Sequence, residues 1–232
     1  QQTALMPELQ ITQEYLGFSN HLVFLAPQWK EFLESDTHCK GPQTTVAGST
    51  DGSVYPHRLS AIAGVANIGQ DVNWCGHHFA QANWYAFGRL AWNHTLTAEE
   101  IAAEWIGMTF TGEPAFSEPV KEMMLRSWET AVDYMMPLGL HHICAWDWLP
   151  PYFHNASPEG IGFDRTTTGS DAVSQYCSPL REQFNDVKSC PEELLLWFHH
   201  VPWDYQMQNG RTLWDELCYR YDGGVQQVRE FQ

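Results

Sequence analysis

The hydrophobic pattern of this 232-residue sequence changes near residue 95, and this change constrains the fold more than any other feature. Before it, short apolar or alternating segments are interleaved with segments whose apolar residues recur every three or four positions. After it, the period is helical almost throughout. Because strands have a period of two and helices one of about 3.6, we predict an α/β region over residues 1–95 and a mainly helical domain over residues 96–232.

Two strand–helix units are predicted in the first region. Residues 8–15 alternate polar and apolar side chains, with Glu14 near the carboxyl end of the strand, and residues 22–33 have helical spacing. Residues 61–69 form a short apolar run that ends at a glycine, which is typical of a buried parallel strand. A second helix is predicted over residues 73–92. Consecutive units of this kind are typical of an α/β barrel or a doubly wound sheet.

The helices of the second region have marked starts. Thr97 to Glu100 and Thr212 to Asp215 are capping-box patterns, in which two side chains satisfy backbone N–H groups at the helix start. A helix is predicted from Ser117 to Met136, with Pro119 in its first turn. Gly223-Gly224 is expected to interrupt the last helix before its pattern resumes. The predicted buried stripe of the long helix consists of Val120, Met123, Met124, Trp128, Val132 and Met135.

The net charge and the aromatic content restrict the classes of ligand that the protein is expected to bind. The sequence has 12 Lys and Arg against 28 Asp and Glu, a formal charge of −16. Such a surface repels nucleic-acid phosphates and anionic lipids, and no apolar run is long enough for a membrane-spanning helix. We therefore expect no nucleic-acid partner and no membrane. With 14% aromatic residues, 11 of them Trp, the composition favours sugars, which stack on flat aromatic faces.

The cysteines and two glycosylation sequons indicate whether the protein is secreted or stays inside the cell. The six cysteines permit three disulfides, and Asn93 and Asn155 each begin an Asn-X-Ser/Thr glycosylation sequon. Together they predict a secreted, extracellular glycoprotein; free thiols and chance sequons are the alternative. The cysteine spacings are unlike zinc or redox motifs, and the adjacent histidine pairs point about 100° apart on a helix. No metal site is therefore expected, and structural or hydrogen-bonding roles are assigned to the histidines at 77–78, 141–142 and 199–200.

Glu14 is the leading candidate for catalysis. A carboxylate at the carboxyl end of a barrel strand lies at the face where active sites assemble, and it can act as a general base. A solvated or ion-paired Glu is the alternative. Glu8 is not its catalytic partner, because six extended residues separate the two by roughly 20 Å.

Two further segments are candidate ligand sites. The polar loop at 160–170 holds Asp164 and Arg165 and could offer a guanidinium to an anion; alternatively, the two residues only order the loop. Trp146 and Trp148, and the segment from Trp197 to Trp203, place aromatic residues beside prolines in predicted loops. They could form a stacking platform for sugar, and core packing explains them equally well.

Five sequence blocks stand in order over nearly the whole chain. They are ELQITQEYLG from residue 8, QANWYAFGRLAW from 81, GIGFDRT from 160, LWFHHVPWDY from 196 and LWDELCYRY from 213. These blocks resemble the xylan α-glucuronidases of glycoside hydrolase family 67. The resemblance implies an inverting hydrolase that releases 4-O-methyl-glucuronic acid, α-1,2-linked, from glucuronoxylan oligosaccharides, with no metal or cofactor.

The resemblance also implies a fold and a catalytic residue. It implies the last β/α units of a (β/α)₈ barrel over residues 1–95 and most of a helical C-terminal domain over residues 96–232, in a chain truncated at both ends. Glu14 matches the family Glu that activates water together with an upstream Asp. In the family, the general acid, that Asp and the main cations for the uronate lie upstream of Gln1. The isolated chain is therefore expected to be inactive.

The sequence departs from the family between Asp147 and Trp148. Family members have a longer segment there, which lies near the substrate and includes a His-Tyr-Gly-Pro stretch. Substrate contacts are assigned to Trp146, Trp148, Asp164 and Arg165, and the shorter segment weakens the assignment of the two tryptophans. The competing interpretation is a non-catalytic module that binds carbohydrate through its tryptophans or forms a homodimer through the helical domain.

Overall fold

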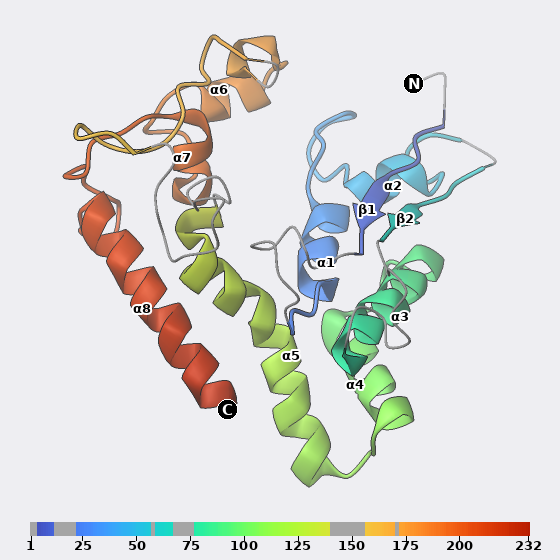
Figure 1. The fold of residues 1–232 in the computed structure, drawn as a ribbon. Coiled ribbons are helices and arrows are strands. Elements are labelled where there is room, and N and C mark those ends of the chain that lie inside the picture. The colour runs from blue at the N-terminus through green and yellow to red at the C-terminus, as the bar shows by residue number, and fades with distance from the viewer. Residues whose placement is uncertain (1–3, 12–21, 57–58, 67–76, 140–155, 170–171) are drawn as a thin grey trace. The chain divides into compact units, whose positions relative to one another are not determined.

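A computed structural model describes residues 4–11, 22–56, 59–66, 77–139, 156–169 and 172–232 (Figure 1). Of these residues, those up to Trp128 form one compact unit, unit 1, and those from Glu129 onward form a second, unit 2. The strands are β1 (Glu8–Gln10) and β2 (Ala63–Val65). The helices are α1 (Ala26–Glu34), α2 (Val46–Thr50), α3 (His78–Trp92), α4 (Ala98–Thr109), α5 (Pro114–Met135), α6 (Leu180–Phe184), α7 (Leu195–Phe198) and α8 (Leu213–Phe231), with short 3₁₀ helices η1 (Pro137–Gly139), η3 (Val173–Gln175) and η4 (Glu192–Leu194).

The two predicted strands of unit 1 pair in parallel (Figure 1). Leu9 lies opposite Gly64, and the Ile11 N–H donates to the Val65 carbonyl at 2.8 Å, which extends the ladder by one bond. The prediction that the second strand is buried is wrong, because all three β2 residues are exposed, Val65 by 46%. Apolar strands are buried when further strands and helices cover them. The described residues contain this one strand pair, so they do not show a barrel.

Three helices make the core of unit 1. α3 packs against α4, and α1 packs against both. α1 has Pro27 in its first turn. Proline lacks a backbone N–H, but the N–H groups of the first turn have no acceptor within the helix, so no helical hydrogen bond is lost. The fully buried side chains on these helices are mostly apolar and recur at helical spacing, as the sequence predicts. They are Ala26, Trp29, Leu33, Ala82, Ala86, Leu90, Ile101, Ala102, Trp105 and Ile106.

The capping box predicted at the start of α4 is confirmed. The Thr97 hydroxyl accepts a hydrogen bond from the Glu100 N–H at 3.1 Å, and the Glu100 carboxylate accepts one from the Thr97 N–H at 2.8 Å. At the start of α8, the Thr212 hydroxyl accepts from the Asp215 N–H at 3.1 Å, which is one of the two bonds of such a box. Each cap stabilises its helix by about 1 kcal/mol.

The observed α5 differs from the predicted helix in two respects, the residue at which it begins and the set of residues that it buries. It begins at Pro114, whose fixed φ suits a first helical position, so Pro119 lies inside the helix and not in its first turn. Of the predicted stripe, Met124 is fully buried, whereas Ser127 and Thr130 are buried although they are polar. Both hydroxyls are satisfied, because Ser127 accepts from the Phe24 N–H at 2.9 Å and Thr130 donates to Gln227 at 2.6 Å.

Unit 2 is built around one apolar cluster beneath α7 and the start of α8. Its members are Leu138, Ile161, Val173, Cys190, Leu195, Leu196, Phe198, Val201, Met207, Leu213 and Leu217. α8 runs without interruption through Gly223 and Gly224, so the predicted break there is wrong. A glycine inside a helix lowers the stability of the helix by about 1 kcal/mol relative to alanine. The adjoining helical turns and the packing on α5 can offset this loss.

The cysteines correct another expectation. All four that lie in the described ranges are free thiols, so the three disulfides that the even count permits are not present. Cys190 is buried in the unit 2 core as a small apolar residue, and Cys39, Cys177 and Cys218 are exposed. Cys75 and Cys144 lie outside the described residues. Among the helices described, none combines the length and the apolar character needed to cross a bilayer.

Candidate functional site

The loop from Gly160 to Gly169 lies against the segment that follows α7. Ile161 forms an antiparallel bridge with Val201, and the Arg165 N–H donates to the Phe198 carbonyl at 2.9 Å. Gly162 has a φ of +104°, and a Cβ there would lie 2.3 Å from the His199 carbonyl oxygen. Only glycine fits this approach, so the glycine-bearing motif serves to fix the loop against its neighbour.

Arg165 is held by two aromatic rings. The centre of its guanidinium lies 4.0 Å from the ring centroid of Phe163 and 4.3 Å from that of Trp197. Phe163 and Arg165 are two residues apart, and their stacking places both side chains on one side of the loop. Trp197 comes from α7 and not from the loop that the sequence predicted. A guanidinium that stacks on aromatic faces is also of the type that can bind a carboxylate in a bidentate manner.

Asp164 has different surroundings from Arg165 although the two are adjacent. It is exposed, and its carboxylate accepts a hydrogen bond from the Thr166 hydroxyl at 3.1 Å. The Thr168 hydroxyl donates to the Asp164 carbonyl at 3.3 Å. These contacts order the following turn of the loop, which favours the structural interpretation for Asp164. Arg165 is the better candidate for contact with an anionic ligand.

The histidine pair after α7 makes hydrogen bonds within unit 2. Nε2 of the buried His199 lies 2.8 Å from the Phe184 carbonyl, and Nδ1 of His200 lies 3.2 Å from the Gly162 carbonyl, so each ring donates to a backbone oxygen. This confirms the hydrogen-bonding role predicted for the pair. Throughout the described ranges, no three His, Cys, Asp or Glu side chains gather as a metal-ligand set.

Glu14 lies outside the described residues, and the nearest described segments before and after it, 4–11 and 22–56, both belong to unit 1. On the preceding side, Ile11 is bonded to β2. On the following side, the buried Asn83 side chain accepts from the Leu25 N–H and donates to the Val23 carbonyl, both at 2.8 Å. Sequence reasoning missed Asn83. The available signal was an amide side chain within the apolar positions of a predicted helix.

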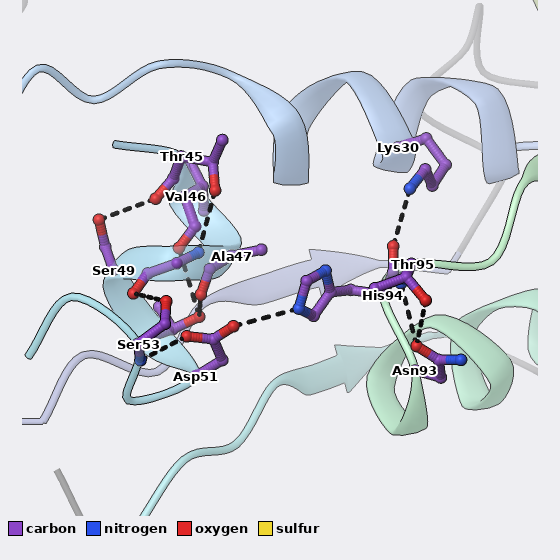
Figure 2. A network of polar contacts seen from close by, with 12 residues as sticks. Lys30, Thr45, Val46, Ala47, Ser49, Asp51, Ser53, Asn93, His94 and Thr95 are labelled. Atoms are coloured by element: carbon purple, nitrogen blue, oxygen red, sulfur yellow. Dashed lines mark hydrogen bonds and ion pairs between the residues drawn. The ribbon is translucent and has the colours of Figure 1, made fainter. Parts of the chain in front are cut away.

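The other predicted site residues are divided between described and undescribed segments. Trp146, Trp148 and Asn155 lie outside the described residues. Asn93 caps the C-terminus of α3, where its Oδ1 accepts hydrogen bonds from the Thr95 N–H at 3.1 Å and the Thr95 hydroxyl at 2.8 Å. Figure 2 shows this turn together with Lys30 and Asp51, which hold His94 between them.

Cys39 is a second residue whose surroundings the sequence did not reveal. Its thiol lies 3.4 Å from the Ser49 hydroxyl, at the side of α2. Hydrogen bonds from Ser49, Thr37 and Tyr55 lower the pKa of this exposed thiol to about 7. Its hydrogen-bonding partners Ser49 and Tyr55 are 10 and 16 positions away, so no local motif marked the thiol as unusual.

Two sequence models of one family together match the chain from end to end. The glycosyl hydrolase family 67 middle domain matches residues 1–74, and the glycosyl hydrolase family 67 C-terminus matches residues 75–232. The chain belongs to glycoside hydrolase family 67. The family boundary after residue 74 precedes α3, whereas the compact units divide within α5.

Proteins of several fungi that are named as alpha-glucuronidases are similar to the chain over most of its length. It is 35% identical to alpha-glucuronidase A of Emericella nidulans, in an alignment that covers 91% of the chain and 27% of that protein. It is 32% identical to the alpha-glucuronidase of Hypocrea jecorina, over 99% of the chain and 29% of that protein. The second alignment spans 245 residues, more than the 232 of the chain, so that relative has residues that the chain lacks.

The chain therefore spans less than a third of the length of these family 67 relatives. The family membership confirms the resemblance drawn from the five sequence blocks.

Proposed function

We propose that this chain forms part of an α-glucuronidase that hydrolyses the α-1,2 bond between 4-O-methyl-glucuronic acid and xylose in glucuronoxylan oligosaccharides. The observation that carries the proposal is the alignment of 91–99% of the chain with family 67 proteins named as alpha-glucuronidases. Residues 1–95 would supply the last β/α units of the catalytic barrel and residues 96–232 the helical domain. No metal or cofactor enters the proposed reaction.

Glu14 is the proposed general base. In an inverting hydrolysis, a base removes a proton from water as the water attacks the anomeric carbon, while an acid protonates the leaving oxygen on the opposite side. The bond from the uronate C1 to the xylose oxygen breaks, and the β-anomer of the uronic acid is released. The resemblance places the acid and a partner Asp upstream of this chain. The 232 residues expressed alone are therefore expected to bind substrate weakly and not to hydrolyse it.

Arg165 is the proposed contact of this chain with the anionic part of the substrate. The stack on Phe163 and Trp197 supports this role, because it holds the guanidinium in one plane and reduces the conformational entropy lost on binding. Asp164 orders the loop beside it. Trp146 and Trp148 are proposed as sugar contacts on the resemblance alone.

The test compares two carboxylates of the same segment in the full-length protein that contains this chain. Glu14→Gln should lower kcat on 4-O-methyl-glucuronosyl xylotriose by about 10²- to 10⁴-fold with little change in KM, because it removes a base that acts in the transition state. Glu8→Gln is the matched control, since Glu8 is an exposed residue of β1. Proton NMR of the first product should show the β-anomer. Near-normal turnover of Glu14→Gln, or retention of the α-anomer, would contradict the mechanism.

The alternative, a non-catalytic module, gives a different result in the same experiment. It predicts that the full-length protein binds xylo-oligosaccharides without releasing uronic acid. Dimer formation through the helical domain is compatible with either function and is tested separately by the solution mass. We also propose secretion, on the two sequons at Asn93 and Asn155 and the fungal relatives.

A further inference from the structure

The turn after α3 is tied to two other elements of unit 1. The Lys30 ammonium on α1 donates to the His94 carbonyl at 2.7 Å, and the His94 ring lies 3.2 Å from the carboxylate of Asp51, the C-cap of α2. The Asn93 N–H also closes the last turn of α3 by donating to the Arg89 carbonyl at 2.8 Å. The backbone on both sides of the Asn93 side chain is thereby fixed (Figure 2).

Among the described residues, the Asn93 side chain makes hydrogen bonds only with its near neighbour Thr95. Both are accepted by the amide oxygen Oδ1. Figure 2 shows the amide nitrogen Nδ2 directed away from Thr95. A group attached to Nδ2 would therefore leave these two bonds intact and break no hydrogen bond among the residues that the structure describes.

Asn93 is partly exposed and lies in a turn at the surface of unit 1. Thr95 is exposed, and Trp92, the residue before Asn93, is 87% exposed. A bulky polar substituent can therefore extend into solvent without displacing packed side chains. These conditions are not met by every asparagine of unit 1, since Asn83 is fully buried and uses its amide to hold the chain at Val23 and Leu25.

We propose that Asn93 is an N-glycosylation site whose glycan is carried at a fixed point on unit 1. The donor would be a lipid-linked oligosaccharide diphosphate. Nδ2 attacks C1 of the first N-acetylglucosamine, the bond from C1 to the diphosphate oxygen breaks, and the lipid diphosphate leaves. The amide nitrogen loses one proton to the transferring enzyme, and no group is oxidised or reduced. The proposal rests on passage of the protein through a secretory pathway and not on its hydrolase activity.

The experiment uses the full-length protein, directed into the secretory pathway of a yeast by a host leader sequence. This leader makes the result independent of the native compartment. The secreted protein is digested, and its glycans are released by peptide N-glycosidase in heavy-oxygen water, which converts a modified Asn to a mass-labelled Asp. Most of the peptide containing Asn93 should carry the label.

Three variants separate modification from misfolding. Asn93→Gln and Thr95→Ala should each lose one glycan from the mass of the secreted protein, whereas Thr95→Ser keeps the sequon and the hydroxyl and should retain it. Each variant is also made with Asn155→Gln, so that the remaining glycan can be assigned. An unlabelled Asn93 peptide from the secreted protein overturns the proposal. If Asn155 is labelled in that sample, the transferase reached the chain and did not use Asn93.

Discussion

The backbone of Gly224 on α8 approaches that of Tyr134 on α5 so closely that a Cβ on Gly224 would lie 2.6 Å from the Tyr134 nitrogen. Real Cβ atoms do not make such contacts with backbone, so a side chain at residue 224 forces α8 away from the end of α5 that lies in unit 2. The preceding residue, Gly223, has open space around its Cβ position. Two adjacent glycines of one helix therefore have opposite roles.

This difference gives a matched pair of stability predictions. Gly224→Ala should lower the free energy of unfolding of unit 2 by about 1–3 kcal/mol, the usual cost of overpacking. Gly223→Ala should raise it by about 0.5–1 kcal/mol, because alanine loses less backbone entropy in a helix. Urea titration followed by circular dichroism measures both values. Equal effects of the same sign would show that the approach to Tyr134 does not limit residue 224.

Glu216 gives a prediction about acid stability. Its side chain is buried, and it accepts hydrogen bonds at 2.8 Å from Arg211, Arg220 and Asn209. Burial acts to raise the pKa of this carboxyl, but the hydrogen bonds from Arg211, Arg220 and Asn209 outweigh it and lower the pKa below its ordinary value of 4.5. The stabilisation is therefore fully present above pH 4.5 and is lost as the pH falls through the lowered pKa.

Glu216→Gln should consequently be less stable than the unchanged protein at neutral pH, with a difference that shrinks as the pH falls below 4.5. Asp222→Asn, which neutralises an exposed carboxylate on the same helix, is the control. Burial raises the pKa of Asp133, which contributes with the opposite sign, and because Glu216 also raises this pKa, that contribution should be smaller in Glu216→Gln. A stability difference that stays constant between neutral pH and pH 3 would contradict the assignment to Glu216.

Local patterns predicted much of this fold. The Thr97 capping box, the helical spacing of α3 and α4, and the parallel pairing of β1 with β2 follow from short-range rules of propensity and periodicity. The failures at α5 and α8 share a cause. The buried Ser127 hydroxyl accepts a hydrogen bond from the Phe24 N–H, which is distant in the sequence. Gly224 lies within α8 at a point where α5 comes so close that a side chain would not fit. Neither contact is visible in a window of one helix.

The candidate site shows the same limit. The adjacent residues Asp164 and Arg165 were predicted as a pair, but the partner that distinguishes them, Trp197, lies more than 30 positions away on α7. The contact between Phe163 and Arg165 joins residues only two positions apart, so this part of the stack was within reach of local sequence reasoning. The role of Glu14 came from the resemblance to a family, because its surroundings could not be derived from periodicity.

The aromatic stack leads to a prediction about substrate affinity. If Arg165 binds the uronate carboxylate, Arg165→Ala should raise KM by about 10- to 100-fold, since a hydrogen bond to a charged group contributes about 1.5–3 kcal/mol. Arg165→Lys should recover part of this loss because it keeps the charge without the planar fork. Arg181→Ala is the control, as an exposed arginine of the same unit. An unchanged KM on the uronate substrate would leave Arg165 with a role in loop structure only.

Cys39 should be the most reactive of the four described cysteines. With a pKa of about 7, roughly half of its thiols are ionised at neutral pH, against a few per cent for an ordinary cysteine. Cys190 provides the opposite case, because it is buried and burial, followed by the nearby Glu193, raises the pKa of its thiol to about 11. Alkylation by iodoacetamide, followed peptide by peptide, should reach half its maximal rate near pH 7 at Cys39 and be negligible at Cys190.

The hydrogen bond from Ser49 is the largest cause of the lowered pKa, so Ser49→Ala should shift the midpoint of the Cys39 rate profile toward higher pH. Cys177, exposed in unit 2, is the internal reference whose rate should not change. A Cys39 profile that rises only near pH 8.5, as for an unperturbed thiol, would show that the hydroxyls beside α2 do not stabilise the thiolate. A shift in the Cys177 profile would instead indicate a general loss of structure in the variant.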